Sequence, residues 1–477
     1  MDNTGIIKKG LDPLIRKILF SNETSTLEDS DLVYSIWVDK AHIAMLLKQG
    51  LISVSQYDDL LSTIEELEKE NFSSLQGQDA GRGIYLLYED YLIEKLGIET
   101  GGVLQTGRSR NDLKATVLLL KLRKPFISLL LQSAQLVQTL ITKSDEYQSV
   151  IMPVFTHYQA AVPVTYGHYL QGIAFAVLRD IGRILGRVDG LNICPIGACA
   201  VGGSSIPIDN LYVAEKLGFS AVFFNSIDAV ASRDATLALQ SDIVLLATSI
   251  SRLTTDLQLW SSSGFDFFIL PDEIVGSSSI MPNKRNAFIL ENIQGKCMNA
   301  GTGFWAATTN LHKTPFSNSI VVGTEAMENI WQSFKLIEDA ILLLNLFINK
   351  AVPNCDKMLK STIEGNTFAT ELANHLVKHK VVSFREAHKI IGEYIYQTFN
   401  EKSSFHQVID KMAKNYNVNF DFSPEKLINQ IVFGGGPGKT VIHSNFHILI
   451  KEIEKVHNSI NKIFQQWNEA INKLNNK

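Results

Sequence analysis

Apolar residues recur every three or four positions over five long stretches of this chain, which is the spacing of one face of an α-helix. Stretches of this length predict helices that pack side by side, and the alternation typical of β-strands is scarce. We therefore expect an all-α fold built around a long central helical bundle. The five stretches are Leu113–Ile141, Tyr166–Leu191, Leu237–Trp260, Ala287–Leu311 and Glu328–Asn349.

Two short segments rich in glycine or proline separate the periodic stretches from the rest of the chain. Gly101-Gly102 precedes the first stretch, and Val352-Pro353 follows the last. Such residues favour turns and often lie between folding units. The asparagine-rich and lysine-rich sequence from Asn400 onward is expected to form solvated surface. We expect an N-terminal helical domain, the central long-helix bundle and a C-terminal helical domain, spanning residues 1–105, 106–352 and 353–477.

The composition is that of a globular chain with a large core and no polyanion-binding character. Of the 477 residues, 45% are hydrophobic and 19% are charged, and the formal net charge is −5. Nucleic acid is therefore not expected as a partner, and any anion site has to be local. The most apolar stretch, Ile243–Trp260, carries Arg252 and Asp256, which is too much charge for a membrane span.

The four cysteines lack the spacing of metal ligands. They are Cys194, Cys199, Cys297 and Cys355, and they lie among small apolar residues, which favours buried thiols in a reducing compartment. The N-terminal residues lack the apolar segment of a signal peptide. We expect a cytoplasmic protein that uses no metal and no cofactor.

The most informative polar segment is a loop, Gly276–Asn286, with the sequence GSSSIMPNKRN. Gly276 and Pro282 keep it non-helical, and its small residues let the backbone approach a ligand closely. The serine hydroxyls supply donors or a base, and Lys284 supplies a compact positive charge for a carboxylate. Taken alone, a serine-rich loop is more often a linker. Two further segments favour a ligand-binding loop over a linker.

The segment Thr106–Asp112, with the sequence TGRSRND, directly precedes the first long helical stretch. Side chains of this kind cap the free backbone N–H groups of a helix start, and a helix N-terminus with two arginines is suited to a carboxylate. An ordinary capped helix would account for Ser109 and Asp112 but not for so dense a polar run. The third segment, Met152–Gln159, contains His157, and a lone histidine is more often structural than catalytic.

Together these three segments resemble the signatures of the fumarase/aspartase superfamily, whose members split a C–N or C–O bond and release fumarate. The segment 106–112 is most similar to that of the argininosuccinate lyase family, and the similarity is best over residues 100–300. The resemblance implies five long central helices flanked by two smaller, mostly helical domains. It also implies a homotetramer that acts on a small-molecule substrate, with each active site made from segments of three subunits.

The resemblance further implies roles for particular residues. Eliminating an amine from a succinyl group requires removal of a weakly acidic C–H proton, so the resulting dianion has to be held by preorganised donors. Ser278 aligns with the catalytic base, His157 with a histidine that helps to protonate the leaving nitrogen, and Glu291 with the carboxylate that pairs with this histidine. The residues aligned with substrate-binding positions are Ser109, Arg110, Asn111, Thr156, Lys284 and Asn286.

The chain departs from the argininosuccinate lyase pattern where that family recognises the amine half of its substrate. The family carries a tyrosine, a glutamine and a lysine shortly after a proline, and here Asn318, Gly323 and Ala326 align with them. The substrate-binding serine of the family aligns with Asp39, which is expected to attract an ammonium group, and Asn318 is expected to contact the substrate too. We therefore expect a carbon–nitrogen lyase that acts on an N-substituted aspartate other than argininosuccinate.

Two alternatives remain open at this point. The first is an argininosuccinate lyase proper that contacts the arginine half through different residues. The second is a non-catalytic structural relative, as lens crystallins of this family show. Retention of Ser278, Lys284, His157 and Asn111 argues against the second alternative.

Overall fold

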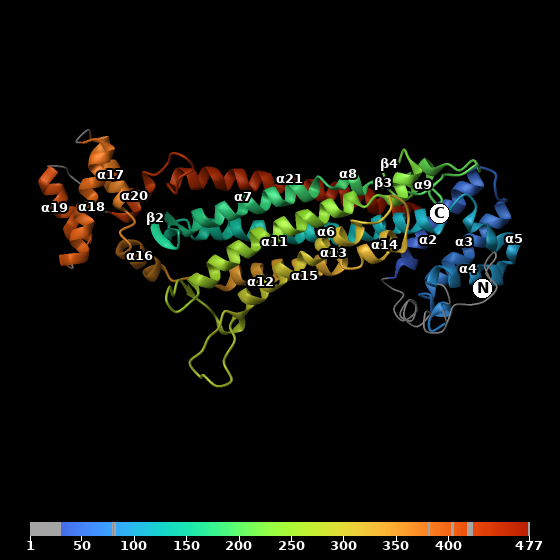
Figure 1. Cartoon of the computed structure of the whole chain (residues 1–477), viewed down its shortest axis with the longest axis horizontal. Coiled ribbons are helices and arrows are strands. Elements are labelled where there is room, and N and C mark those ends of the chain that lie inside the picture. The colour runs from blue at the N-terminus through green and yellow to red at the C-terminus, as the bar shows by residue number, and fades with distance from the viewer. Residues whose placement is uncertain are drawn as a thin grey trace.

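Long helices that run side by side form the centre of the molecule (Figure 1). The computed structural model describes residues 30–78, 80, 83–379, 382–401, 405–416 and 423–475. Within these residues the predicted all-α fold is confirmed, because the strands are few and short. The long helices are α6 (Arg110–Glu146), α7 (Tyr166–Leu185), α11 (Asp234–Trp260), α15 (Ile330–Lys350) and α21 (Lys439–Asn475).

The apolar periodicity predicted four of these helices and missed one. The first, second, third and fifth predicted stretches correspond to α6, α7, α11 and α15, whereas Ala287–Leu311 forms two shorter helices, α12 (Phe288–Ala300) and α13 (Thr302–Leu311). The missed helix, α21, lies in sequence that we expected to be solvated. It packs along α6 and α7 and buries residues such as Leu449 and Ile453, so it belongs to the central core.

Short helices pack on one another at one end of the molecule, beside the start of α6 (Figure 1). The first of these helices packs against both α6 and α21, so this end of the molecule contacts two helices of the bundle. The predicted N-terminal range 1–105 begins outside the described residues. The elements here are α2 (Asp31–Lys48), α3 (Val54–Lys69), α4 (Ile84–Leu96) and α5 (Ile98–Gly101), with the 3₁₀ turns η1 (Ser73–Leu75) and η2 (Gly102–Gln105).

Two-stranded sheets join the helices in the part of the chain that the structure describes. An antiparallel hairpin of β1 (Ile151–Thr156) and β2 (Gln159–Thr165) connects α6 to α7. The other pairs are parallel β3 (Ile193–Cys194) with β4 (Ala221–Val222), and antiparallel β5 (Phe268–Ile269) with β6 (Val352–Pro353). The remaining short elements are α8 (Val188–Leu191), α9 (Asn210–Lys216), α10 (Ser226–Ala231), η3 (Asp272–Ile274), α14 (Ile320–Gly323) and η4 (Glu325–Met327).

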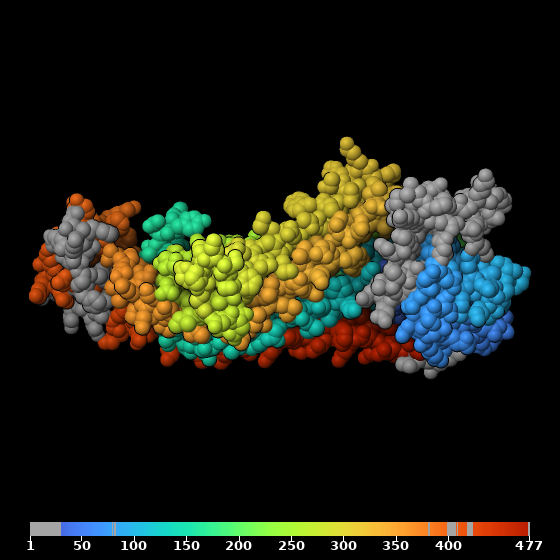
Figure 2. Space-filling view, turned by 90° about the horizontal axis from the view of Figure 1, so that it is seen from below, coloured from blue at the N-terminus to red at the C-terminus, as the bar shows by residue number. Residues whose placement is uncertain are grey.

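The helices that follow α15 form a second apolar cluster at the far end of the elongated molecule (Figure 2). Phe368, Leu372 and Met412 are fully buried there. The chain then returns along the bundle as α21, so the predicted range 353–477 contains a helix whose core contacts lie in the central bundle. The three domain ranges remain predictions. The helices of this cluster are α16 (Cys355–Glu364), α17 (Ala369–Lys378), α18 (Phe384–Glu401), α19 (Phe405–Tyr416) and α20 (Pro424–Asn429).

Among the described residues, α6 and not the stretch Ile243–Trp260 is long and apolar enough to cross a membrane by length and composition alone, which corrects the choice of the most apolar stretch. Of the most apolar window of α6, 61% is buried inside the molecule. It packs against α7, α15 and α21. Its apolar side chains therefore serve the helical core, and the expectation that the protein has no membrane partner remains a prediction.

Candidate active site

The segment before α6 forms the capped helix start that its sequence predicts. Ser109 Oγ accepts a hydrogen bond from the Asn111 backbone N–H at 3.3 Å, and the Ser109 N–H donates to Asp112 Oδ1 at 3.0 Å. Arg110 is exposed, whereas Ser109 and Asn111 are half-buried. The arrangement places three predicted substrate-binding side chains, Arg110 among them, at a helix N-terminus, where the backbone favours an anion.

Asp112 fixes this helix start to a distant loop, a role that the sequence did not reveal. Its Oδ2 accepts hydrogen bonds from the backbone N–H groups of Gly197 and Cys199, at 3.0 and 2.9 Å. Burial raises the pKa of Asp112, and these hydrogen bonds oppose the rise. The position of Asp112, three residues after Ser109, was a signal for capping, but nothing in the spacing indicated the loop.

Asn111 and Asn318 lie in direct contact although 207 positions separate them. Asn318 Nδ2 donates to Asn111 Oδ1 at 2.9 Å, and Asn111 Nδ2 donates to the Ala200 carbonyl at 3.1 Å. Both asparagines are half-buried. The structure thus brings together one residue expected to bind the succinyl half and one expected near the amine half.

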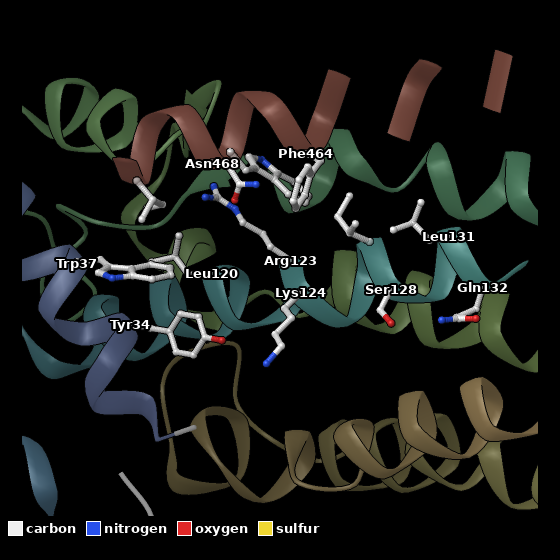
Figure 3. Close-up of a pocket in the computed structure, with 13 residues that line it drawn as sticks. Tyr34, Trp37, Leu120, Arg123, Lys124, Ser128, Leu131, Gln132, Phe464 and Asn468 are labelled. Carbon is white, nitrogen blue, oxygen red and sulfur yellow. The ribbon is translucent and has the colours of Figure 1, made fainter. Parts of the chain in front are cut away.

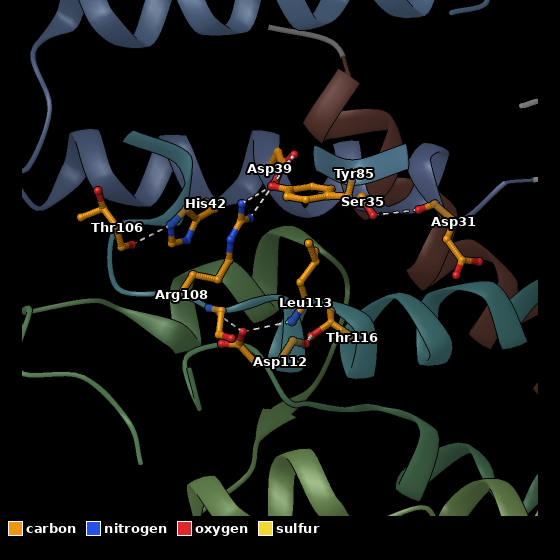
Figure 4. A network of polar contacts seen from close by, with 11 residues as sticks. Asp31, Ser35, Asp39, His42, Tyr85, Thr106, Arg108, Asp112, Leu113 and Thr116 are labelled. Carbon is orange, nitrogen blue, oxygen red and sulfur yellow. Dashed lines mark hydrogen bonds and ion pairs between the residues drawn. The ribbon is translucent and has the colours of Figure 1, made fainter. Parts of the chain in front are cut away.

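Asp39 has a different partner from the one that we expected. Its carboxylate accepts a hydrogen bond from Arg108 Nη1 at 2.6 Å and another from the Tyr85 hydroxyl at 3.1 Å (Figure 4). Its side chain is fully buried. A carboxylate that is paired and enclosed in this way exposes no surface to an ammonium group in this structure, and the expected contact of Asp39 with the substrate remains a prediction.

The hairpin of β1 and β2 presents Thr156 and His157 to solvent at its tip. The turn has φ of +52° at His157 and +59° at Tyr158. Two-residue hairpin loops favour turns with positive φ at both central residues, although asparagine and glycine usually occupy them. The Tyr158 side chain is 85% exposed. The hairpin therefore presents an exposed imidazole at its tip.

The serine-rich loop is closed at its base and open at its tip. Gly276 and Asn286 exchange two backbone hydrogen bonds of 2.8 Å, and Arg285 Nη2 donates to the Leu270 carbonyl at 2.7 Å. Ser278 is half-buried, and its Oγ accepts from the backbone N–H of Met281 at 3.1 Å. Figure 1 shows this loop standing out from the bundle.

The predicted residues do not converge within one chain. Asn111 lies at the start of α6 and His157 lies shortly beyond its end, and 37 residues at 1.5 Å each make this helix about 55 Å long. Phe155 of the hairpin contacts Phe265, which precedes the serine-rich loop, with ring centroids 5.3 Å apart. The hairpin and the loop therefore lie toward one end of the bundle, and the start of α6, which carries Asn111, lies toward the other (Figure 1).

Other predicted residues are present without the partners that we expected for them. Glu291 is exposed in the first turn of α12, and among the described residues it has no hydrogen bond or ion pair with His157. Lys284 is exposed and Asn286 half-buried in the loop. No group of three histidine, cysteine or acidic residues in the described ranges is arranged to hold a metal ion. The expected absence of a metal and of a cofactor remains a prediction.

A separate apolar groove lies between α2, α6 and α21 (Figure 3). It has a volume of about 430 Å³ and contains none of the predicted site residues. Arg123 lies beside it, with its guanidinium over the rings of Phe219 and Trp467, and burial lowers its pKa to about 9. We assign the groove no part in the reaction.

Comparison with known proteins identifies the family. Residues 48–301 match the lyase family, and residues 366–431 match the C-terminal region of argininosuccinate lyase. An argininosuccinate lyase 1 from Shouchella clausii (strain KSM-K16) is 30% identical over 451 residues, which are 92% of this chain and 91% of the relative. The chain belongs to the argininosuccinate lyase family. An argininosuccinate lyase from Methanocorpusculum labreanum is 37% identical over 386 residues, covering 80% of this chain and 77% of the relative.

Solved structures show that this argininosuccinate lyase family member has the fold of the superfamily. An EDDS lyase variant with bound fumarate superposes with a TM-score of 0.84 at 23% identity, covering 98% of this chain and 95% of that one. A class II fumarase from Schistosoma mansoni superposes with a TM-score of 0.70. The predicted family, fold and enzyme class are confirmed. The protein is a carbon–nitrogen lyase whose reaction releases fumarate.

Proposed function

We propose that this lyase splits, or forms, an N-substituted aspartate whose amine half is smaller or less like guanidinium than arginine. The observation that carries the proposal is the hydrogen bond between Asn318 and Asn111. It places Asn318, which stands where the family has a tyrosine, against the segment expected to bind the substrate. A changed residue at this contact changes what the site recognises.

The two other substituted positions support the same proposal. A side chain at Gly323 would begin 3.5 Å from Asn318 Oδ1, so this position also borders the contact with Asn111. Ala326 is fully buried, and it provides neither the length nor the charge of a lysine. A site that forms hydrogen bonds with its own substrate rejects a substrate that cannot form them, because polar groups are then left unpaired. The site therefore lacks the donors that an argininosuccinate lyase directs at arginine.

The fumarate-forming half of the reaction is supported by the serine-rich loop. The Met281 N–H donates to Ser278 Oγ at 3.1 Å, and such donors stabilise the alkoxide that a serine base requires. Lys284 and Asn286 follow in the same loop and provide charge and a donor for the dianion. In the proposed reaction Ser278 removes the C–H proton, the C–N bond breaks, and His157 delivers a proton to the leaving nitrogen.

We propose a homotetramer in which each site combines segments from several subunits. The support is the distance between the two ends of α6, about 55 Å, which prevents Asn111 and His157 of one chain from contacting the same small molecule. Large apolar side chains also remain exposed on the bundle, and such surface commonly marks an interface. They include Leu245 and Leu259 on α11, Met298 on α12, Trp305 on α13, and Leu342 and Leu346 on α15.

The cytoplasm is the proposed location, supported by four cysteines that are all free. Two of them, Cys194 and Cys297, are buried as expected, whereas Cys199 is half-buried and Cys355 is exposed. The names of the relatives favour a second candidate, argininosuccinate lyase proper. The substitutions beside Asn111 favour the first candidate instead. A purely structural role has less support, because the loop keeps a serine held by a backbone N–H group and a nearby lysine.

The direct test is synthesis from fumarate, because addition and elimination use the same site. Purified enzyme is incubated with fumarate and a panel of single amines, namely ammonia, small diamines and amino acids including arginine, and the loss of fumarate absorbance is followed. We expect at least one amine other than arginine to be consumed at a rate above about 1 s⁻¹, which is the lower end for ordinary enzymes. Activity with arginine alone would overturn the proposal.

A further inference from the structure

Asp39, Tyr85 and Arg108 form a closed ring of hydrogen bonds beside the start of α6 (Figure 4). Arg108 Nη1 donates to Asp39 Oδ1 and Arg108 Nη2 donates to the Tyr85 hydroxyl, each at 2.6 Å. The Tyr85 hydroxyl donates to Asp39 Oδ1 at 3.1 Å. The side chains of Asp39 and Arg108 are both 0% exposed. The three residues come from α2, α4 and the segment before α6, so the ring ties three parts of the chain together.

Neither charge in this ring is stable without the other. A buried ion pair is tolerated when its geometry is good and its remaining polar atoms are bonded, and removing one partner leaves an uncompensated charge. Burial raises the pKa of Asp39, and the charge of Arg108 opposes that rise. The position of Arg108 is therefore determined by Asp39.

The backbone around Arg108 is anchored on both sides. His42 Nε2 lies 3.0 Å from the Thr106 carbonyl, and burial lowers the pKa of His42, so its neutral ring donates this hydrogen bond. Gly107 has φ of +68°, and a Cβ there would lie 2.5 Å from Ile208. On the other side, Asp112 bonds the Ser109 N–H. The segment around Arg108 is therefore held on both sides, and it leads directly into Ser109, Arg110 and Asn111.

We propose that Asp39 is a positioning residue for fumarate binding: by holding Arg108, it sets the backbone from which Ser109, Arg110 and Asn111 reach the substrate carboxylate. This rests on the proposed function, in which those three residues bind the succinyl half. Asp39 acts only through Arg108, because its own carboxylate is enclosed. The amine half of the substrate consequently receives no charge contact from this position.

The test compares two substitutions that each remove one buried carboxylate. Asp39→Asn keeps the shape of the side chain and leaves Arg108 without its counter-charge. Asp242→Asn is the matched control, because Asp242 on α11 is also buried and accepts from Nε of Arg187, which lies between α7 and α8, at 2.6 Å. Fumarate binding to the full-length protein is measured by calorimetry without any amine, together with Tm. We expect the Kd for fumarate to rise about tenfold or more in Asp39→Asn and to stay within about twofold in Asp242→Asn.

A milder variant covers the case in which Asp39→Asn does not fold. Tyr85→Phe keeps the ring that packs on Tyr88 and removes only the hydroxyl that accepts from Arg108 Nη2. We expect its Kd for fumarate to rise about threefold or more, at a Tm close to that of the unaltered protein. A Kd within about 1.5-fold of the unaltered protein in Tyr85→Phe would overturn the proposal.

Two results separate this inference from the proposed function. A lower Tm with unchanged fumarate Kd in Asp39→Asn would show a purely structural role for Asp39, whichever amine the enzyme uses. Conversely, activity with arginine alone would refute the proposed substrate class. The fumarate Kd values would still report on Asp39, because fumarate is common to both candidate reactions.

Discussion

Replacing Ser278 with alanine is expected to lower turnover by about 10²- to 10⁴-fold while leaving fumarate binding nearly intact. The reason is that a general base acts on the barrier to proton removal, whereas most ground-state contacts come from other residues of the site. In the structure the hydroxyl accepts from the Met281 N–H, so its loss removes a group that is already held in place. Turnover is followed by fumarate absorbance with the productive amine, and binding is followed by calorimetry.

Ser277→Ala is the matched control for this experiment. Ser277 is the exposed neighbour of Ser278 in the same loop. The control therefore measures how far the removal of any serine hydroxyl from this loop lowers activity. We expect it to retain activity within about twofold of the unaltered enzyme. If Ser278→Ala keeps turnover within about tenfold, a difference of only about 1.4 kcal/mol, then Ser278 is not the base.

Co-expression of two inactive variants is expected to restore activity. Ser278→Ala and His157→Asn should each be poorly active alone, because every site then lacks one of the two groups. In the proposed homotetramer, a site of a mixed assembly that takes its serine from one variant and its histidine from the other would be complete. With random assembly about a quarter of the sites should be complete, which predicts about a quarter of the activity of the unaltered enzyme.

The composition of the mixed tetramers is checked by native mass spectrometry with two differently tagged chains. Variants purified separately and combined without subunit exchange serve as the control and should remain inactive. Proven mixing without recovered activity would show that His157 and Ser278 do not come from different subunits.

Local patterns in the sequence predicted most of the bundle but not its last helix. α6, α7, α11 and α15 have wide apolar faces that bury many side chains, and this gives a strong helical period. α21 buries only a narrow stripe that includes Leu449, Ile453, Val456 and Ile460. Its other positions are rich in lysine, asparagine and glutamate, so the composition indicated solvated surface although the stripe has helical spacing.

The candidate site was predictable only where its residues are neighbours in the sequence. The segment 106–112 and the serine-rich loop have their polar residues in consecutive positions, so a motif was enough to propose them as parts of a site. Arg108 and Asp39 are 69 positions apart, and Asn111 and Asn318 are 207 positions apart. No spacing rule relates residues so distant, and only tertiary packing shows that Asp39 already has a partner and that Asn318 contacts Asn111.

The central claim, that the amine half of the substrate is not arginine, is tested most directly by kcat/KM for argininosuccinate. In the proposed site, Asn318, Gly323 and Ala326 replace the tyrosine, glutamine and lysine of the argininosuccinate lyase pattern, and each polar contact contributes about 1–3 kcal/mol when a site is built for it. We expect kcat/KM to lie at least about a hundredfold below the ordinary enzyme value of about 10⁴ M⁻¹s⁻¹, and the best amine of the panel to reach that value. A kcat/KM for argininosuccinate of about 10⁴ M⁻¹s⁻¹ or more would contradict the claim and identify the protein as an argininosuccinate lyase proper.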